Sequence, residues 1–486
     1  MSHALTIAVA LLLPALGALV VALCGRWPNV RDAATLVVST LTFLCVCTLV
    51  PAVQSGIQPT LHLFEVLPGL PLLFQIEPLG MLFALVASGL WILTSLYAIG
   101  YMRGHHEENQ TRFFAFFAVA ISAALAAAFS GNMLTLFFSY EVLTLSTYPL
   151  VTHHRTPEAL RAGRIYMGIL LATSIGLLLL GVILTYHVAG TLSFVPGGIL
   201  AGHATPLMTG ILLFLYAYGT GKAALMPIHR WLPNAMVAPT PVSALLHAVA
   251  VVKTGVFTIV KVVVYIFGID HLSTTGFNIY LAYAAATTVL LASIIAMTQD
   301  NLKARLAYST ISQLAYIVLG AALANANGII GASMHIAMHA CGKITLFFCA
   351  GAIMVSLHKT EISDMRGIGR QMPFTLAAFT IGALSIIGVP PLGGSWSKWY
   401  LALGAADTGH LVLVAVLMLS SLLNIAYLMP IPVRAFFSTG GDDHHEGLRE
   451  APLFCLVPLC LTALGCIALF FFADPLYKLV APIVQH

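Results

Sequence analysis

Long apolar segments recur from one end of this 486-residue chain to the other, with no long polar linker between them. A run of roughly 18 or more apolar residues is long enough to cross the hydrocarbon core of a bilayer as a helix. Charged residues make up only 8% of the chain, whereas about a quarter of an average soluble domain is charged. The sequence therefore predicts one polytopic, all-α membrane domain and excludes an ordinary soluble protein.

The apolar runs predict about fourteen transmembrane helices. Their expected limits are 4–24, 32–54, 78–100, 112–130, 133–151, 162–188, 207–231, 240–268, 276–298, 306–324, 328–357, 374–402, 409–437 and 452–473. The first run is too long for the apolar core of a signal peptide and lacks a basic segment before it. We therefore expect it to be the first span.

The basic residues test this map independently. Every second connection contains Lys or Arg, and the alternate connections contain none. The residues are Arg26 and Arg31; Arg103 and Arg112; Arg155, Arg161 and Arg164; Arg230; Lys303 and Arg305; Lys359, Arg366 and Arg370; and Arg434 and Arg449. By the positive-inside rule, these seven connections are expected in the cytoplasm and both termini outside. The chain has no basic tract, so nucleic acid is not an expected partner.

Two of the predicted spans contain backbone breakers near their middles. The seventh has Gly219 and Gly221 just before Lys222, and the twelfth has prolines and glycines at 390–394 just before Lys398. Proline removes a helical hydrogen bond and glycine weakens the helix, so both spans are expected to be discontinuous. Spans 4–8 and 9–13 are two sets of five with opposite orientation, as an inverted repeat requires.

A single membrane domain, 1–486, is therefore expected to contain four segments. They are helices 1–3 in 1–111, a first inverted repeat in 112–268, a second in 276–437, and helix 14 with the C-terminal end in 452–486.

Six ionisable residues interrupt the apolar runs, where a charge at mid-membrane costs at least about 2.5–3.5 kcal/mol. They are Glu141, Lys222, Lys253, Lys261, Lys343 and Lys398. Such residues usually mark a polar path for ions or protons, and lysine suits a proton relay because a buried ammonium readily loses its proton. Lys261 lies nearer the end of its span, so we expect its long side chain at the outer interface.

Glu141 is the only acidic residue deep in a span, and Lys222 is its expected ion-pair partner. Adding or removing a proton nearby would then form or break this ion pair. The alternative is a static pair that fixes helix packing.

His335, His339 and Lys343 are spaced by four and are expected on one face of the eleventh span. Two histidines at this spacing can bind a metal, but the glutamate of the zinc-protease pattern is missing and no third ligand is evident. A water-linked proton relay is favoured over a metal site, with hydrogen-bonded structural histidines as the alternative. His247, six residues before Lys253, is a weaker relay candidate.

No redox cofactor is expected in this chain. Its eight cysteines fall in apolar runs without CxxC spacing, and no GxGxxG motif is present. The fragment GTGK at 219–222 lacks the first glycine and the Ser or Thr of a phosphate-binding loop.

At these motifs the chain resembles the antiporter-like subunits shared by Mrp-type cation/proton antiporters and respiratory complex I, over spans 3 to 13. The strongest matches are SYEVLTLSTYPLV, GKAALMPIHRWLPNAMVAPTPVSALLHAVAVVKTGVF, NLKARLAYSTISQLAYIVLG, MHIAMHACGKITLFF and GVPPLGGSWSKWYL. The run HKTEISDMRGIGRQMP is most similar to the D subunit of the Mrp-type antiporters.

The resemblance implies fourteen helices, two inverted five-helix repeats and broken helices 7 and 12. The implied path comprises Glu141, Lys222, His247, Lys253, His335, His339, Lys343 and Lys398. Glu141 and Lys222 would form the pair of the first half-channel, and Lys398 would occupy the helix 12 position of the second. Some complex I members have glutamate at that last position, so lysine argues against that branch. The long lateral helix of the largest complex I member is also missing from the sequence to His486.

By this resemblance we expect a proton-translocating subunit of a multi-subunit Mrp-type sodium/proton antiporter in a bacterial cytoplasmic membrane. Its partners would be other membrane subunits, the lipid bilayer, protons and Na⁺, with no cofactor and no metal. It would be part of a transporter and not an enzyme. The alternatives are a proton-pumping subunit of complex I or a membrane-bound hydrogenase, a proton-coupled subunit of an inorganic-carbon uptake complex, and a relic that no longer conducts.

Overall fold

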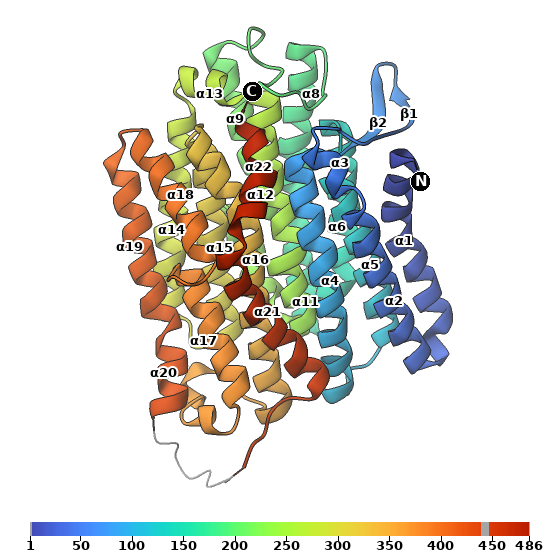
Figure 1. The fold of residues 1–486 in the computed structure, drawn as a ribbon, viewed down its shortest axis with the longest axis vertical. Helices are drawn as coiled ribbons and strands as arrows, with labels where there is room; N and C mark the ends of the chain where they lie inside the picture. The colour runs from blue at the N-terminus through green and yellow to red at the C-terminus, as the bar shows by residue number, and fades with distance from the viewer. Residues whose placement is uncertain (1, 439–446, 486) are drawn as a thin grey trace.

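The computed structural model describes residues 2–438 and 447–485, and it describes only the backbone of Leu246 and His247. Helices dominate this part of the chain, and its one sheet is a two-stranded hairpin. The hairpin and both chain ends lie toward the end of the bundle that is opposite the C-terminus of α20 (Figure 1). The chain is an all-α polytopic protein, as its apolar runs predict.

The helices and strands have the following bounds: α1 His3–Leu23, α2 Pro28–Cys47, α3 Val50–Gln54, β1 Thr60–Leu67, β2 Leu70–Gln75, α4 Pro78–Gly104, α5 Gln110–Ala128, α6 Met133–Val151, α7 Pro157–Thr173, α8 Leu179–Ala189, α9 Pro206–Gly219, α10 Trp231–Asn234, α11 Thr240–Ala244, α12 Val251–Val262, α13 Ile269–Thr275, α14 Asn278–Thr298, α15 Leu302–Ala322, α16 Ala326–Leu357, α17 Pro373–Ile387, α18 Gly394–Asp407, α19 Leu411–Leu428, α20 Pro430–Phe437, α21 Leu453–Phe471 and α22 Ala473–Val480. Single π-helical turns at Ser174–Leu178, Leu245–Val249 and Val263–Phe267 join or extend some of these helices.

Ten helices of the described chain are long and apolar enough to cross a bilayer, or eleven if the bent pair Val251–Phe267 and Ile269–Thr275 forms one span. Each of the fourteen predicted spans contains helix, but not every one passes this test. Breaks shorten α9 and α17, and polar side chains such as Gln313 lower the hydropathy of α15.

All seven basic connections meet at one end of the bundle, which we call the basic rim. The contacts between connections are Arg31 to Gln110, Glu107 to His154, the Leu302 amide to the Thr360 carbonyl, Lys303 to the Ala238 carbonyl, and the Arg449 amide to the Gln371 carbonyl. His154 and Val237 line one cavity, which joins the remaining connection to the rim. The prediction that these connections share one side of the protein is confirmed.

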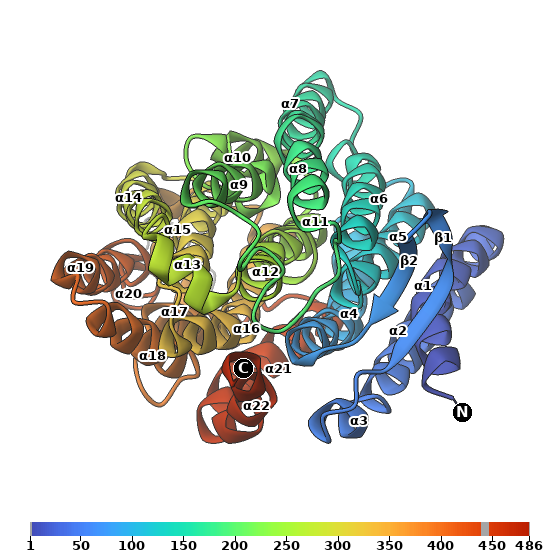
Figure 2. The same cartoon turned by 90° about the horizontal axis from the view of Figure 1, so that it is seen from above.

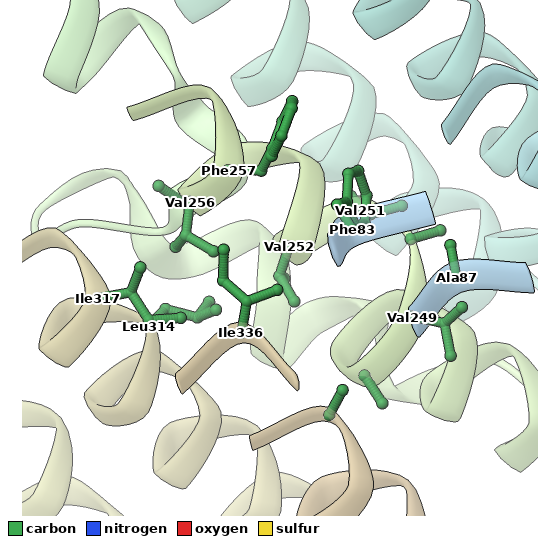
Figure 3. Packing of buried hydrophobic residues seen from close by; sticks show 14 of the residues in the cluster. Phe83, Ala87, Val249, Val251, Val252, Val256, Phe257, Leu314, Ile317 and Ile336 are labelled. Atoms are coloured by element: carbon green, nitrogen blue, oxygen red, sulfur yellow. The ribbon is translucent and has the colours of Figure 1, made fainter. Parts of the chain in front are cut away.

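The middle of the bundle is built around α12, which lies close to α4 and α16 when the molecule is seen from above (Figure 2). Every residue of α12 is buried. Val256 and Phe257 of this helix pack among Phe83 of α4, Ile317 of α15 and Ile336 of α16 (Figure 3). Because apolar side chains fill the surroundings of α12, each polar group on it needs a partner from a neighbouring helix.

Both predicted helix breaks are present. α9 ends at Gly219, and Lys222 lies in a single 3₁₀ turn, Gly221–Ala223, that follows it. α17 ends at Ile387 before Gly388, whose φ of +91° favours glycine, and the chain becomes helical again at the start of α18. The segments 1–111, 112–268, 276–437 and 452–486, and the inverted relation of the middle two, stay predictions.

The glycines of the GTGK fragment have a packing role. A Cβ atom at Gly221 would collide with the Thr173 side chain. Across the break, a Cβ atom at Gly255 of α12 would collide with the backbone of Lys222 and Ala223. Glycine at these positions lets the broken helix touch α12 two residues from Lys253.

Candidate functional site

A buried lysine and a buried histidine meet in the middle of the bundle. Nζ of Lys253 on α12 lies 2.5 Å from Nδ1 of His339 on α16. Neither side chain is accessible to solvent beyond 1%. Two polar groups that would each be costly to bury alone are therefore stabilised by one strong hydrogen bond.

From His339 a stack of rings leads across α16 to α18. The ring centroids of His339 and His335 are 5.6 Å apart, and those of His335 and Tyr316 are 5.9 Å apart. Nζ of Lys398 lies 4.8 Å from the centroid of the Tyr316 ring. We call the series Lys253, His339, His335, Tyr316 and Lys398 the central column. It places an amine at each end of three stacked rings.

His335 can hold a proton without rearrangement of its neighbours. Nδ1 lies 2.8 Å from Oγ of Ser397, and Nε2 lies 3.2 Å from Oε1 of Gln313. Oxygen atoms thus face both ring nitrogens, and each can accept a hydrogen bond from a protonated imidazole. The neutral ring fits as well, because the Ser397 hydroxyl can also donate.

Lys398 lies at the break between α17 and α18. Nζ donates to the Ile387 carbonyl at 3.1 Å and to Oγ of Ser421 at 3.4 Å. The Ile387 carbonyl is one of the unpaired groups at the C-terminal end of α17, where the helix dipole favours a cation. The break in the helix therefore provides a binding position for the Lys398 ammonium.

Lys222 is held by α6 and not by an acidic residue. Nζ donates to the Tyr140 carbonyl at 2.9 Å and to Oγ1 of Thr144 at 2.5 Å, and it lies 3.1 Å from the centroid of the Tyr140 ring. The backbone amide of Lys222 also donates to the Tyr140 hydroxyl at 3.1 Å.

The predicted contact between Glu141 and Lys222 is wrong in its geometry. Among the described residues no ion pair joins them, and neither carboxylate oxygen of Glu141 has a hydrogen-bond partner, although both are buried. Tyr140 and Thr144 share one face of α6, and Glu141 is turned about 100° away from Tyr140.

Lys343 leaves the face that holds the two histidines of α16. Its Nζ donates to Oγ of Ser309 at 2.6 Å and to the Leu306 carbonyl at 3.3 Å. Ser309 lies 2.9 Å from the hydroxyl of Tyr427, so Lys343 begins a second polar branch between α15 and α19. The expectation of one continuous His335–His339–Lys343 face is correct for the two histidines, and Lys343 points toward the basic rim.

Lys261 does not lie at the outer interface, as expected from its place near a span end. The side chain is fully buried, and Nζ lies 2.7 Å from Oε1 of Glu77, which caps the N-terminus of α4. Nζ also donates to the Ser130 carbonyl at 2.7 Å. The ring centroid of Phe194, from the loop before α9, lies 4.6 Å from Nζ, and the side chain is closed off from water.

His247 has only its backbone described, in the π-helical turn Leu245–Val249, so the prediction for its side chain lies outside the described residues.

Sequence reasoning missed Tyr140, Thr144, Tyr316 and Ser397. Hydroxyl-bearing residues are common in apolar spans, and no spacing rule distinguishes these from the others.

The arrangement suits proton transfer more than cation binding. The central column offers amines and imidazoles, which exchange protons, whereas Na⁺ and K⁺ need several oxygen ligands. Among the described residues, no group of three His, Cys, Asp or Glu side chains is placed to hold a metal ion.

Two family models match the chain. The model described as NADH:quinone oxidoreductase/Mrp antiporter, transmembrane, matches residues 130–424, which include the breaks and the central column. A second, described as the N-terminus of chain 5 of NADH-ubiquinone oxidoreductase (complex I), matches residues 69–114.

Curated relatives share about a third of their residues with the chain. NADH-quinone oxidoreductase subunit N of Desulforudis audaxviator is 33% identical, over 85% of this chain and 83% of its own length. NADH-quinone oxidoreductase subunit L of Mycobacterium tuberculosis is 32% identical over 81% of this chain, which spans 62% of that relative. A Rhizobium meliloti protein named as a probable K⁺/H⁺ antiporter subunit, of the A/B type, is 31% identical over 88% of this chain, which spans 43% of that relative.

Two solved structures have the same fold. A chain of the membrane-bound sulfane sulfur reductase, an archaeal respiratory membrane complex, aligns with a TM-score of 0.85 and 25% identity, over 98% of this chain and 97% of that one. A chain of the Mrp complex from Dietzia sp. DQ12-45-1b aligns with a TM-score of 0.86 and 22% identity, over 99% of this chain and 97% of that one.

Proposed function

Because the chain belongs to the NADH:quinone oxidoreductase/Mrp antiporter family, we propose that it translocates protons in an Mrp-type monovalent cation/proton antiporter. Relatives with these names are subunits of complex I-like or antiporter assemblies, which supports the role of a membrane subunit in a larger complex. The proposal assigns this chain the proton path of such a complex and gives it other membrane subunits as partners.

The central column is the single observation that carries the proposal. It links α12 to α18 through polar groups, whereas most of the buried side chains around it are apolar. Burying this many polar groups in the middle of a membrane protein costs free energy. A purely structural bundle has no need of them, whereas a proton path requires them.

Along the column, a proton on His339 is exchanged with Lys253 through the hydrogen bond that joins them. From the neighbouring His335 ring, either the Ser397 hydroxyl or water passes the proton toward Lys398.

The other half of the proposed path begins at Glu141 and Lys222. The close approach of Gly255 on α12 to the backbone of Lys222 supports a connection between this half and Lys253. The two unpartnered carboxylate oxygens of Glu141 are expected to bind water that connects it to Lys222. His247 and Lys343 complete the predicted set, His247 beside Lys253 in the chain and Lys343 on its own branch.

We place the basic rim in the cytoplasm and both termini outside a bacterial cytoplasmic membrane, following the positive-inside rule. Exposed apolar side chains on outward faces of the bundle, such as those of α1 and α19, support contact with lipid or with partner subunits.

Na⁺ is the proposed exchanged cation, handled either here or by a partner subunit, and a relative named as part of a probable K⁺/H⁺ antiporter supports monovalent cation exchange in general. A second candidate is a proton-pumping subunit of a redox-driven complex. The identities of 33% and 32% to NADH-quinone oxidoreductase subunits favour it. Coupling to inorganic-carbon uptake has no such observation behind it.

Isolation of the native complex separates these candidates by its subunits, because redox subunits contradict the antiporter, whereas a set made only of small membrane subunits supports it. Transport in vesicles tests the proton path itself. Glu141→Gln and Lys222→Ala are expected to abolish or strongly reduce proton transport, with Glu141→Asp as the charge-retaining control. Unchanged transport in both variants would instead indicate a relic or a purely structural pair.

A further inference from the structure

A cavity of about 170 Å³ lies in the basic rim, outside the proposed path. Its polar wall is formed by Tyr101 and His105 at the end of α4, Glu107, His154 after α6, Thr240 at the start of α11, and Lys303 at the start of α15. With Lys359 and Thr360 after α16, five connections that are remote in the sequence thus contribute titratable or hydroxyl groups to this one cavity.

Three imidazoles surround the Glu107 carboxylate. Nδ1 of His105 lies 3.1 Å from Oε1, and Nδ1 of His154 lies 3.5 Å from Oε2. These two side chains are 29% and 35% exposed, whereas the Glu107 side chain is only 6% exposed. The carboxylate is thus reached from the solvent through two imidazoles, and an imidazole can both accept and donate a proton.

His153 is the third imidazole, and it is buried. Its Nε2 lies 4.0 Å from Oε2 of Glu107, and its Nδ1 is buried without a hydrogen-bond partner. Burial, with the neighbouring His154 and Arg112, lowers the pKa of His153 to about 4, so this ring stays neutral at ordinary pH. A neutral ring with one open nitrogen has room for a water molecule or a proton in transit.

Other charges also face the cluster. They are Arg112 of α5, Arg155 after α6, Lys303 of α15 and Lys359 after α16, with His358 beside the ring of His105. The Glu107 carboxylate is therefore surrounded by an excess of positive charge.

On its inner side the cavity meets a run of hydroxyl groups. The Tyr101 ring stacks on His105 and on Tyr97, and the Thr240 hydroxyl donates to the Tyr101 hydroxyl at 3.5 Å. A Cβ atom at Gly351 of α16 would collide with both the Tyr97 hydroxyl and the Thr240 side chain. Because glycine has no side chain, the Tyr97 hydroxyl and the Thr240 side chain fit between α4, α11 and α16 at this point.

Beyond Tyr97 lie buried polar atoms that have no protein partner. They are Oγ of Ser95 and Nε1 of Trp91, which follow inward along α4, and Oγ of Ser243 on α11. α11 packs against α4 and leads through the turn Leu245–Val249 to Lys253. Buried polar atoms without partners are the usual sites of internal water, so this region suits a water chain.

We propose that the Glu107 cluster, with His105, His153 and His154, is the site where the proton path exchanges protons with water on the basic-rim side. This inference rests on the proposed function. A proton leaves water for an imidazole nitrogen of His105 or His154 and passes to the Glu107 carboxylate. It continues by hydroxyl groups and water toward Lys253, and each transfer is reversible.

The test uses inside-out membrane vesicles that carry the native assembly, so that the basic rim faces the medium. An outward gradient of Na⁺ or K⁺, or the redox substrate if the complex is redox-driven, drives proton uptake, which a pH-sensitive dye records. Glu107→Gln is expected to slow uptake about tenfold near pH 8.5, where free protons are scarce, and much less near pH 6. Glu108→Gln, an exposed neighbour with the same charge change, is the matched control and is expected to keep the wild-type rate.

Added imidazole separates proton exchange from a structural role. At about 10 mM, its free ring can carry protons in place of the cluster, so it is expected to restore uptake by Glu107→Gln and not by Lys222→Ala. His154→Gln, at a half-exposed position, repeats the test if Glu107→Gln lowers the amount of assembled complex.

Two results would overturn the inference. One is a wild-type rate of proton uptake by Glu107→Gln and by His154→Gln near pH 8.5. The other is a loss of uptake that is equal at pH 8.5 and pH 6 and is not restored by imidazole. If the wild-type assembly itself took up no protons under any of these driving forces, the proposed function would fail. Uptake by wild type and by Glu107→Gln alike would defeat only this inference.

Discussion

Nζ of Lys253 and Nδ1 of His339 are 2.5 Å apart, although the two residues are 86 positions apart in the sequence. One belongs to the predicted first repeat and the other to the predicted second. The hydrogen bond is therefore the place where a proton would pass from one half of the chain to the other. The neighbouring stack of His335 and Tyr316 extends it to Lys398.

The hydrogen bonds from Lys222 to Tyr140 and Thr144 of α6 give a first prediction. Thr144→Val keeps the shape of the side chain and removes the hydroxyl that accepts from Nζ of Lys222. We expect proton transport to fall about tenfold, because loss of a hydrogen bond to a charged group is worth about 1.5–3 kcal/mol. Ser146→Ala on the same helix removes a hydroxyl that bonds only to its own helix, and it serves as the control. Equal rates in the two variants would remove Thr144 from the path.

The end of the central column gives a second prediction. Lys398→Ala is expected to abolish proton transport, because no other amine in the described residues lies against Tyr316. Tyr316→Phe keeps the ring under the ammonium and should retain most of the rate, whereas Tyr316→Leu should not. Transport in vesicles measures all three variants. A silent Lys398→Ala would show that the second half-channel is wrongly assigned.

The pair of Glu77 and Lys261 is expected to stabilise the fold without carrying protons. Glu77→Gln leaves a buried ammonium without its counter-charge, which costs about 3–5 kcal/mol in comparable cases. Thermal unfolding of the isolated complex should show a lower midpoint, and the double variant Glu77→Gln, Lys261→Met should recover much of it. Transport per folded complex should be unchanged in the double variant. A loss of transport there would place the pair on the proton path.

The buried ring of His153 predicts a pH dependence of stability. Its pKa is lowered from 6.5 to about 4 by burial, so between these values the unfolded chain binds more protons than the folded one. Stability is then fully present above about pH 6.5 and decreases as the pH falls toward 4. The thermal midpoint of His153→Gln should depend less steeply on pH across this window. The same slope in variant and wild type would contradict the assignment.

The sequence predicts the helical fold, the grouping of basic loops and the two helix breaks, because these follow from local signals. Apolar runs, alternating Lys and Arg connections, and glycine or proline clusters act within a few residues. It also identifies Lys222, Lys253, His335 and His339 as buried polar groups and Lys398 as a partly buried one. Their partners are a different matter, because they depend on how helices rotate against one another.

Two of the corrections show this limit. Glu141 and Lys222 are the obvious charge pair, but the rotation of α6 turns Tyr140 and Thr144 toward the lysine. Lys261 is near a span end, but the loops beyond it cover that end and provide Glu77. Neither the rotation of a helix nor the path of a covering loop has a signal in hydropathy or spacing.

Proton uptake by vesicles that carry the assembly with Lys253→Arg or Lys253→Met tests the central claim most directly. Arginine keeps the positive charge but does not release its proton, whereas methionine removes the charge and keeps much of the shape. If protons pass through Lys253, uptake per assembled complex falls to background in both variants. Wild-type uptake by Lys253→Arg would show that only the charge matters, and wild-type uptake by Lys253→Met would contradict the proton path altogether.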